Sequence, residues 1–540
     1  MNNDENLAEI ITIKDKQIAE LELQLEKSKA LVRFYEEQFR LMKARQFCSS
    51  SEKPMHNGQP SLFGEAENVA DVDLPELEKI TYTRQKRRGK RADDLSGLPV
   101  ETVVHTLPEK EQVCPECGEK LHEMGHEIRR ELKIIPAQVK VVEHNRTVYS
   151  CRNCEKNSGH VPVVKAPMPE PVIKGSLASP SAVSHIMTQK YVMYAPLYRQ
   201  EQDWKRQGVA LSRQTMANWV IISAEAWLRP LYDRMRSKLL QQEVIHGDET
   251  TIQVLHEPDK SPTSKSYMWL YRTSGDTKRH IIIFEYQPSR ASIHPKAFLA
   301  GFKGFLHCDG YQAYHLLPPE IIIIGCWGHM RRKFTDSLKA IPAEQRPSSV
   351  AQEAIQKIGY LFHLEGLWEN LDPQERYTRR LKESRPLAEA FFVWLTTLGI
   401  LPQSSAGKAI HYALEQQRWL MNVYLDGRTE ISNNRIENSV RPFALGRKNF
   451  LFCNTVNGAN ASAIVYSIIE TAKANGLKPF EYLKFLFETL PNCRTSAIDA
   501  LLPWGDMVPE HCKMPISKEG ARDAEKERNE IHDGVCSGVS

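Results

Sequence analysis

Apolar residues near the start of the chain recur every seven positions. Two adjoining rows of apolar side chains repeat in this way: Ile11, Ile18, Leu25, Val32 and Phe39, and Leu7, Leu21, Tyr35 and Met42. This spacing predicts a coiled-coil helix over residues 1–45, which would join the protein into a homo-oligomer, most simply a dimer. Lys14 and Ser28 interrupt the pattern. An amphipathic helix packed on its own chain therefore remains an alternative.

The pattern dissolves into polar and charged positions over residues 46–98, which predicts a flexible basic linker. Residues Arg84–Arg91 hold six basic side chains in eight positions. Such a run is either a solvated linker or a contact with a nucleic-acid backbone that reads no sequence.

Four cysteines in residues 99–160 form two Cys-x-x-Cys pairs separated by 33 residues: Cys114 and Cys117, then Cys151 and Cys154. Four thiolates at this spacing suit one structural Zn²⁺ ion in a zinc ribbon, and a disulfide pairing is the alternative. The intervening stretches Ile134–Pro136 and Val139–Val142 are expected to be short strands.

Residues 172–240 have a helical pattern. A helix is expected over Pro196–Gly208, and a second over Arg213–Val220 with Ser212 as its N-cap. Two helices joined by a glycine turn predict a helix-turn-helix-like DNA-binding region, although an ordinary helical hairpin gives the same pattern. The side chains offered to a DNA groove would be Arg213, Gln214 and Asn218.

From Val244 the period changes to that of strands. Strands are expected at Val244–Val254, Tyr267–Arg272, His280–Tyr286, Gly304–Asp309 and Ile321–Ile324, with a helix at Pro295–Ala300 before the fourth. This order outlines a ribonuclease-H-like catalytic core within a multidomain α+β protein. Its two parts would be residues 241–335 and 425–490, separated by a helical insertion at 336–424.

The last elements are less regular. A glycine-, alanine- and asparagine-rich loop is expected at Asn457–Ala461, followed by a helix over Ser462–Lys473. Residues 491–540 would form a C-terminal segment that is unstructured from about Glu510.

Three acidic residues lie at sequence positions where a carboxylate is unusual. Asp248 lies in the middle of an apolar strand, Asp309 closes another, and Glu437 stands at the start of a helix. Strands are depleted in aspartate, and a buried carboxylate usually binds a cation or a proton. The strand order would put Asp248 on the central strand and Asp309 at the end of its neighbour. Glu249 is left out because alternate side chains point to opposite faces.

Basic residues follow Glu437 closely. Arg441, Arg447 and Lys448 are candidates for binding DNA phosphates, with surface ion pairs as the alternative. His329 lies just after the fifth expected strand, either near the acidic residues or as a structural histidine.

The composition of the chain bears on where it could bind nucleic acid and on whether it could cross a membrane. The 540 residues carry 71 basic and 67 acidic side chains, a net charge of +4, so any nucleic-acid surface must come from local segregation of charge. No apolar run approaches the roughly 20 residues of a membrane span, and the N-terminus lacks the basic start of a signal peptide. We therefore expect a cytoplasmic protein without a membrane partner.

Several short stretches resemble the transposases of the insertion-sequence-66 family, a branch of the DDE transposases. The stretches that carry the resemblance are Ser50–Lys53, Ser61–Phe63, Asp248–Thr250, Asp309–Tyr314, Cys326–Phe334, Asn433–Glu437, Arg441–Pro442, Gly446–Asn449, Glu470–Lys473 and Leu502–Trp504. The paired cysteines belong to the same pattern.

The resemblance implies a DNA transposase that binds the ends of a mobile element and then cleaves and transfers DNA strands. By the same resemblance Asp248, Asp309 and Glu437 take the catalytic positions, where they would hold two Mg²⁺ or Mn²⁺ ions. The partners would be double-stranded DNA at the element ends and the target, with accessory transposition proteins of the same element.

Two other functions are compatible with parts of the pattern. Another ribonuclease-H-like nuclease or a resolvase would use the same three carboxylates without strand transfer. A non-catalytic zinc-ribbon and helix-turn-helix DNA-binding protein would leave the three acidic residues unexplained.

Overall fold

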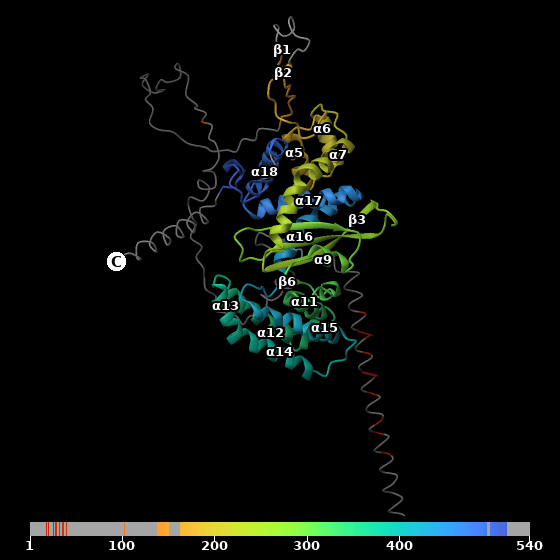
Figure 1. Cartoon of the computed structure of the whole chain (residues 1–540). Helices are drawn as coiled ribbons and strands as arrows, with labels where there is room; N and C mark the ends of the chain where they lie inside the picture. Colours follow the sequence, from red (N-terminus) through yellow and green to blue (C-terminus); the bar gives the residue numbers. More distant parts are fainter. Residues whose placement is uncertain are drawn as a thin grey trace, which may run out of the picture. The chain divides into compact units, whose positions relative to one another are not determined.

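The computed structural model describes residues 138–150, 163–493 and 497–515, together with Thr102 and isolated positions between Lys14 and Phe39. The chain divides into two compact units. One unit comprises residues 1–75 and 169–514, and the other comprises residues 76–168 and 515–540. Figure 1 shows the elements of both.

The described positions near the N-terminus are helical. Ile18, Leu25, Val32 and Phe39, which belong to the predicted heptad row, are each 53–55% exposed in the single chain. Their helical state agrees with the pattern, while self-association remains a prediction.

The smaller unit contains a two-stranded antiparallel ladder. Strand β1 (Val148–Ser150) pairs with β2 (Val163–Lys165), and Ser150 lies opposite Val163. The expected strand at Val139–Val142 is wrong: these residues are exposed and pair with no described strand. An apolar stretch without a neighbouring strand cannot form a ladder. The four cysteines and Ile134–Pro136 lie outside the described residues.

The larger unit is built on a mixed sheet with the strand order β5-β4-β3-β6-β7. Its strands are β3 (Val244–His256), β4 (Lys265–Thr273), β5 (Ile282–Gln287), β6 (Gly304–Cys308) and β7 (Ile321–Gly325). Strands β3, β4 and β5 are antiparallel, whereas β6 and β7 run parallel to β3. The longest strand, β3, therefore lies at the centre. A short strand, β8 (Cys453–Thr455), pairs with its far end.

Between residue 163 and the sheet, the described helices are α5 (Pro180–Tyr191), α6 (Leu197–Arg206), α7 (Arg213–Ser223) and α8 (Arg229–Leu239). Gly208 follows α6 with a φ of 82°, and Ser212 caps α7 by accepting a hydrogen bond from the Thr215 N–H. Both features agree with the sequence prediction. Apolar residues of these helices, such as Met187 and Leu231, share one hydrophobic core with strands β3 to β5.

The helices that follow in sequence are α16 (Asn434–Phe450), α17 (Val456–Ala474) and α18 (Pro479–Thr489). Helix α16 packs on β3 and β4, α17 packs on the edge strand β5, and α18 packs on α5 and α17. The edge strand β5 bonds to α17, because Ser467 Oγ accepts from the Phe284 N–H at 2.8 Å and Thr471 Oγ1 accepts from the Ile282 N–H at 3.0 Å. Two hydroxyls one helical turn apart thus satisfy donors that an exposed edge would leave open.

The expected loop at Asn457–Ala461 is wrong, since these residues form the first turns of α17. Thr455 is the N-cap and accepts a hydrogen bond from the Gly458 N–H. Ala459 and Ala461 are buried in the core, so packing overrides the loop-like composition.

The segment between β7 and α16, where a helical insertion was predicted, is helical and has a second hydrophobic core. In Figure 1 these helices lie on the opposite side of the sheet from α17. They are α11 (Trp327–Leu338), α12 (Val350–Leu367), α13 (Pro373–Arg379), α14 (Arg385–Thr397) and α15 (Ser405–Leu420). This second core includes Trp327 and Phe334, so the helical body begins at α11. Two short helices, α9 (Ile293–Phe298) and α10 (Gln312–His315), flank β6.

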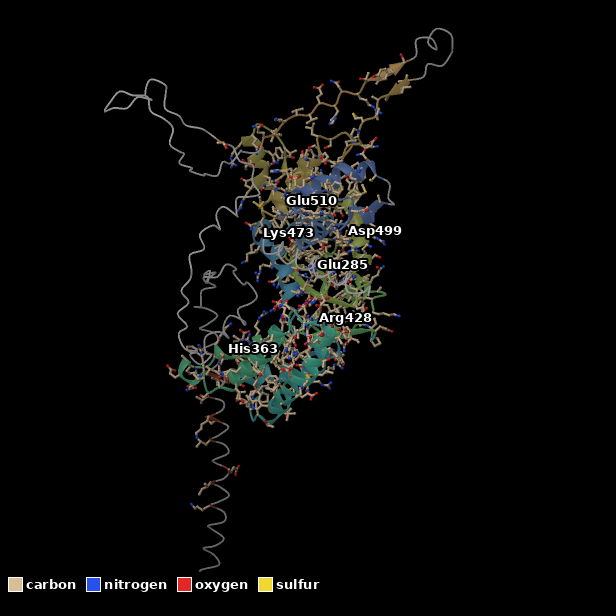
Figure 2. The ribbon with its side chains drawn as sticks, turned by 90° about the vertical axis from the view of Figure 1, so that its left-hand side faces the viewer. Glu285, His363, Arg428, Lys473, Asp499 and Glu510 are labelled. Atoms are coloured by element: carbon tan, nitrogen blue, oxygen red, sulfur yellow. The ribbon has the colours of Figure 1, made fainter. Side chains whose placement is uncertain are left out.

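The chain is ordered as far as Pro515, so the predicted unstructured tail does not begin at Glu510. Residues 516–540 of that prediction lie outside the described residues. Cys512 is fully buried, its carbonyl accepts from the Lys478 N–H at 2.7 Å, and the Met514 N–H donates to the Gly476 carbonyl at 2.7 Å. The preceding helix α19 (Ile498–Leu501) is tied to α8 by Asp499, labelled in Figure 2, which accepts from Arg234 Nε at 2.7 Å. Among the residues that the structure describes, no helix is long and apolar enough to cross a membrane.

Candidate active site

Asp248 and Asp309 lie at the same end of two neighbouring parallel strands. The last paired residues of β3 and β6 are His246 and His307. Asp248 and Asp309 each stand two residues beyond that pair, and Asp309 directly follows the last residue of β6. This is the end of a parallel pair at which ligands commonly bind.

Glu437 reaches this region from the first turn of α16, and it is only 6% exposed. Two side chains of α11 hold its carboxylate. Arg332 Nη2 lies 3.3 Å from Oε2, and His329 Nδ1 lies 3.6 Å from Oε1. Within the described part of the chain, Glu437 Oε1 is buried without a hydrogen-bond partner.

The negative charges of Asp309 and Glu437 act on Asp248. The pKa of Asp248 is raised well above its ordinary value, mainly by burial and then by the negative charges of Glu249, Asp309 and Glu437. The Glu249 N–H, which donates to Asp248 Oδ1 at 2.8 Å, offsets this in part. Negative charge has therefore accumulated at buried oxygens. A hard divalent cation such as Mg²⁺ or Mn²⁺ suits such a donor set, and Glu437 Oε1, which makes no hydrogen bond within the described residues, is suited to bind it.

Glu249, by contrast, has both oxygens engaged. Its side chain is 1% exposed and accepts hydrogen bonds from Arg290 Nε and from the Tyr314 hydroxyl, each at 2.6 Å. Arg290 also approaches Asp309, with Nη2 3.8 Å from Oδ2, and stacks over the Tyr311 ring. The arginine thus links Glu249 to Asp309.

A buried polar network lies directly beneath the acidic residues. Asn433 Oδ1 accepts from His246 Nδ1 at 2.8 Å, Asn433 Nδ2 donates to the Gly247 carbonyl at 3.0 Å, and the Asn433 N–H donates to Cys326 Sγ at 3.1 Å. Asn433 therefore joins β3, the start of α11 and the segment that leads into α16.

The same network includes β6 through His307. Its ring stacks on that of His246 at a centroid distance of 4.4 Å, and its Nε2 accepts from the Glu430 N–H at 3.1 Å. Burial and the neighbouring His246 hold the pKa of His307 well below its ordinary value, so this ring is neutral and can accept. The segments that carry Asp248, Asp309 and Glu437 are thus tied together.

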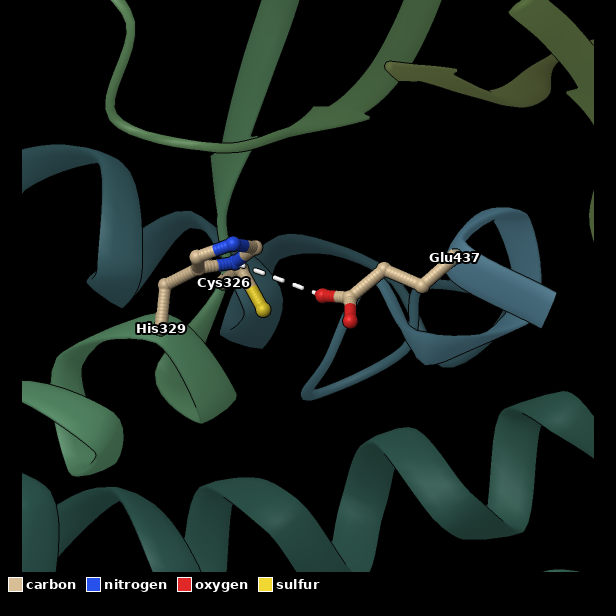
Figure 3. Close-up of side chains that lie close together, drawn as sticks. All are labelled: Cys326, His329 and Glu437. Atoms are coloured by element: carbon tan, nitrogen blue, oxygen red, sulfur yellow. Dashed lines mark ion pairs between the residues drawn. The ribbon is translucent and has the colours of Figure 1, made fainter. Parts of the chain in front are cut away.

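Cys326, His329 and Glu437 form a second feature of the site, drawn in Figure 3. Their sulfur, nitrogen and oxygen ligand atoms all lie within 4.8 Å of one another. Burial lowers the pKa of His329, but the Cys326 sulfur and the Glu437 charge outweigh burial and raise it to about 9. Among the residues that the structure describes, no other group of three or more His, Cys, Asp or Glu side chains has its ligand atoms this close together.

The three residues proposed for a DNA groove share an exposed face of α7. Arg213, Gln214 and Asn218 are all exposed. Gln214 Nε2 donates to Asn218 Oδ1 at 3.4 Å, and the Arg213 guanidinium lies over the Tyr198 ring of α6. A helix surface that presents amide and guanidinium groups together is compatible with base contacts.

The basic residues after Glu437 have different surroundings. Arg447 Nη1 donates to Thr250 Oγ1 at 3.1 Å and to Thr251 Oγ1 at 2.8 Å, so this arginine fastens α16 to β3. Lys448 is exposed, whereas Arg441 is half-buried with its Nε unpartnered among the described residues. The contacts of Arg447 give this residue a structural role that does not require DNA. Lys448 is the most solvent-exposed of the three basic residues.

The family profile described as "Transposase IS66 family" matches residues 175–461, more than half of the chain and the whole region that carries the acidic residues. The chain belongs to this transposase family. Three further profiles match parts of the chain: "zinc-finger binding domain of transposase IS66" at residues 111–155, "IS66 C-terminal element" at 467–504 and "Transposase C of IS166 homeodomain" at 35–103. The first of these spans all four paired cysteines, which supports the zinc assignment of this IS66 transposase.

Similar proteins occur in Sinorhizobium fredii (strain NBRC 101917 / NGR234). The uncharacterized protein y4jD is 29% identical over 78% of this chain and 84% of its own length. The uncharacterized proteins y4qI and y4hP are 31% and 30% identical over 71% and 72% of this chain, covering 71% and 73% of their own lengths. The similarity therefore extends over most of the IS66 transposase.

Proposed function

We propose that this transposase cleaves and joins DNA with two divalent metal ions held by Asp248, Asp309 and Glu437. The observation that carries the proposal is the position of Asp248 and Asp309 at one end of adjacent strands, where the charge of Glu437 acts on Asp248. Three carboxylates on rigid elements form a preorganised site for hard cations.

We assign the sheet and its helices to the ribonuclease-H-like fold. Three antiparallel strands followed by two parallel ones, in the order β5-β4-β3-β6-β7, support this assignment. In that arrangement the helical body beginning at α11 is an insertion between the second acidic residue and the third.

Two Mg²⁺ or Mn²⁺ ions at the site would neutralise the scissile phosphate, activate the attacking hydroxyl and stabilise the leaving oxygen. Asp248, Asp309 and Glu437 would hold these ions, and Asp248 experiences the charges of both other carboxylates. In the cleavage step a water molecule would attack the phosphodiester, so that the flanking DNA keeps the phosphate and the element end leaves with a 3′-hydroxyl. In the second step that hydroxyl would attack a target phosphodiester in line at the same site.

The chain's cationic side chains would keep the carboxylates in position. Arg332 holds Glu437 Oε2 and leaves Oε1 directed elsewhere, while Arg290 approaches one oxygen of Asp309. Each arginine fixes one carboxylate orientation before DNA arrives, which removes reorganisation from the reaction. The exposed Lys448 would contact DNA phosphates, and the half-buried Arg441 could do so after a side-chain movement.

DNA recognition would come from the other modules. The exposed face of α7 would enter a groove at the element end, and the zinc ribbon and the basic linker would contact the backbone. The exposed heptad row at Ile18, Leu25 and Val32 would pair two copies of the chain through a coiled coil, bringing two element ends together. Accessory proteins of the same element would join this complex.

The test is strand transfer by the purified full chain in Mg²⁺ on a labelled oligonucleotide of the adjoining element's end, with Asp309→Ala in parallel. Joined product from the wild type alone supports the proposal. Cleavage without joining would favour another nuclease or a resolvase of the same fold. Specific DNA binding unchanged by Asp309→Ala, with no metal-dependent cutting, would favour a non-catalytic DNA-binding protein.

A further inference from the structure

Cys326, His329 and Glu437 bring three different metal-ligating groups to one place. Cys326 is the N-cap residue of α11, directly after β7, and His329 stands in the first turn of the same helix. Glu437 faces them from the first turn of α16, and Figure 3 shows the imidazole and thiol directed toward its carboxylate. Helices far apart in sequence thus converge on this group.

The group contains buried polar atoms whose bonding is incomplete. His329 Nδ1 and Glu437 Oε1 are 3.6 Å apart, beyond hydrogen-bonding distance, and neither atom has another hydrogen-bond partner among the described residues. The Glu437 side chain is more than nine-tenths buried. The two atoms form an ion pair but make no hydrogen bond. Buried polar atoms without a hydrogen bond are costly, and a metal ion between them would satisfy both.

The donor set favours a softer ion than Mg²⁺. Thiolate and imidazole ligands select Zn²⁺, whereas Mg²⁺ takes oxygen ligands. Ligand atoms around one tetrahedral zinc ion are on the order of 3.3–3.7 Å apart, as its bond lengths require. The 3.6 Å between His329 Nδ1 and Glu437 Oε1 falls in that range. One ligand atom from each of the three residues lies within 4.8 Å of the other two.

The surroundings also orient the sulfur. The Asn433 N–H donates to Cys326 Sγ at 3.1 Å, a hydrogen bond of the kind that positions and stabilises a metal-bound thiolate. Three protein ligands leave a fourth tetrahedral position for water, so the site differs from a closed four-cysteine structural site.

We propose that Cys326 Sγ, His329 Nδ1 and Glu437 Oε1 form a Zn²⁺ site separate from the four paired cysteines, and that zinc bound there withdraws Glu437 from the catalytic carboxylates. The inhibitory role of zinc rests on the proposed function, because zinc can inhibit in this way only if Glu437 is needed to bind Mg²⁺. Zinc bound at this site would then inhibit strand transfer. One oxygen cannot complete both ion sites at once.

Zinc stoichiometry tests the site without reference to activity. The full chain, wild type and Cys326→Ser, is dialysed against buffered Zn²⁺, and zinc per chain is measured by elemental mass spectrometry. The expected result is one zinc ion fewer per chain in Cys326→Ser, whatever the occupancy of the paired cysteines. Cys453→Ser is the matched control, because Cys453 is also buried but lies on β8 outside the group.

His329→Ala provides a second variant in case Cys326→Ser unfolds, which circular dichroism would reveal. It too should lose one zinc ion per chain. Equal zinc content in the wild type, Cys326→Ser and His329→Ala, with all three folded, would overturn the site.

The inhibitory role has its own measurement, which is strand transfer by the wild type in Mg²⁺ as Zn²⁺ is added. Product should fall at least 10-fold when the extra zinc ion binds, and higher Mg²⁺ should restore it. An unchanged amount of joined product at full zinc occupancy would show that zinc does not inhibit strand transfer, although the zinc site itself would still be supported. A stoichiometry difference in a protein that transfers no strand even without added zinc would uphold the zinc site and count against the proposed function.

Discussion

The ring of His246 and the side-chain amide of Asn433 meet in the protein interior, with His246 Nδ1 donating to Asn433 Oδ1 at 2.8 Å. His246 precedes Asp248 by two residues, and Asn433 precedes Glu437 by four. One buried hydrogen bond therefore fixes the first acidic residue relative to the third, although 187 positions separate the two bonded residues. The acidic residues are placed by the network beneath them as well as by their own strands and helix.

Replacing Asn433 by alanine should lower the rate of strand transfer by about 10–100-fold, the usual effect of losing a group that orients metal ligands. DNA affinity should not change, because Asn433 is buried and distant from the exposed face of α7. Single-turnover kinetics with pre-bound DNA would separate the two effects.

Asn422→Ala is the matched control for this prediction. Asn422 Nδ2 donates to the Ile323 carbonyl at 2.8 Å, a similar bond to the sheet away from the acidic residues. Equal losses of activity in both variants would mean that Asn433 acts only through stability.

Asp248→Asn should stabilise the metal-free protein at pH 8. The folded-state pKa of Asp248 is raised, so ionisation disfavours the folded state, and wild-type stability falls as the pH rises from about 4 toward that raised value. Calorimetry in EDTA should show a higher melting temperature for Asp248→Asn at pH 8, and convergence with the wild type near pH 4.

With added Mg²⁺ the wild type should have a higher melting temperature at pH 8 than Asp248→Asn, because the bound ion compensates the charge that destabilises the metal-free wild type. Asp336→Asn, which removes an exposed carboxylate paired with Lys339, should change neither measurement. A wild-type melting temperature insensitive to Mg²⁺ would count against ion binding at Asp248.

Glu285, labelled in Figure 2, should limit stability at neutral pH for a related reason. Burial raises its pKa to about 7, with Gln287 and Arg236 acting in the opposite direction. The wild type should therefore lose stability between about pH 4.5 and pH 7, and Glu285→Gln should gain about 2–3 kcal/mol at pH 8 and nothing at pH 4.

Urea titrations at the two pH values would measure the gain. Glu353→Gln, at an exposed ion pair with Lys357, is the control and should show no comparable gain. A constant difference between Glu285→Gln and the wild type at both pH values would exclude titration of Glu285 as the cause.

Asn218→Ala should cost about 1–3 kcal/mol of binding to the element end and relax preference at one base pair, if α7 reads a groove. Binding to unrelated DNA should change little. Fluorescence anisotropy with both DNAs would show this, with Arg385→Ala as a control, because Arg385 is an exposed residue of α14 paired with Glu389. Equal loss on both DNAs would indicate a backbone contact instead.

Local pattern was enough to predict much of the main unit. The strand alternation located β3 to β7 and the carboxylates in them, and the Ser212 cap located the start of α7, because these signals depend on neighbouring residues. The Asn457–Ala461 helix and the ordered segment after Glu510 were missed, since burial of Ala459 and Cys512 comes from distant contacts.

The candidate site was only partly predictable for the same reason. His246, His307 and Asn433 meet across three separate elements, and Arg290 comes from a loop after β5. The sequence does offer one signal: a histidine stands two residues before each of Asp248 and Asp309. Adjacent parallel strands bring such histidines together, but the pairing becomes evident only when the register is known.

The central claim is that the acidic residues bind the catalytic ions directly, and metal rescue of Asp309→Cys tests it best. A sulfur ligand disfavours Mg²⁺ and tolerates Mn²⁺, so strand transfer by Asp309→Cys should fall at least about 100-fold in Mg²⁺ and recover at least about 10-fold in Mn²⁺. Asp309→Ala should not recover. Wild-type levels of joined product from Asp309→Ala in Mg²⁺, or equal Mn²⁺ stimulation of both variants, would contradict direct metal binding by Asp309.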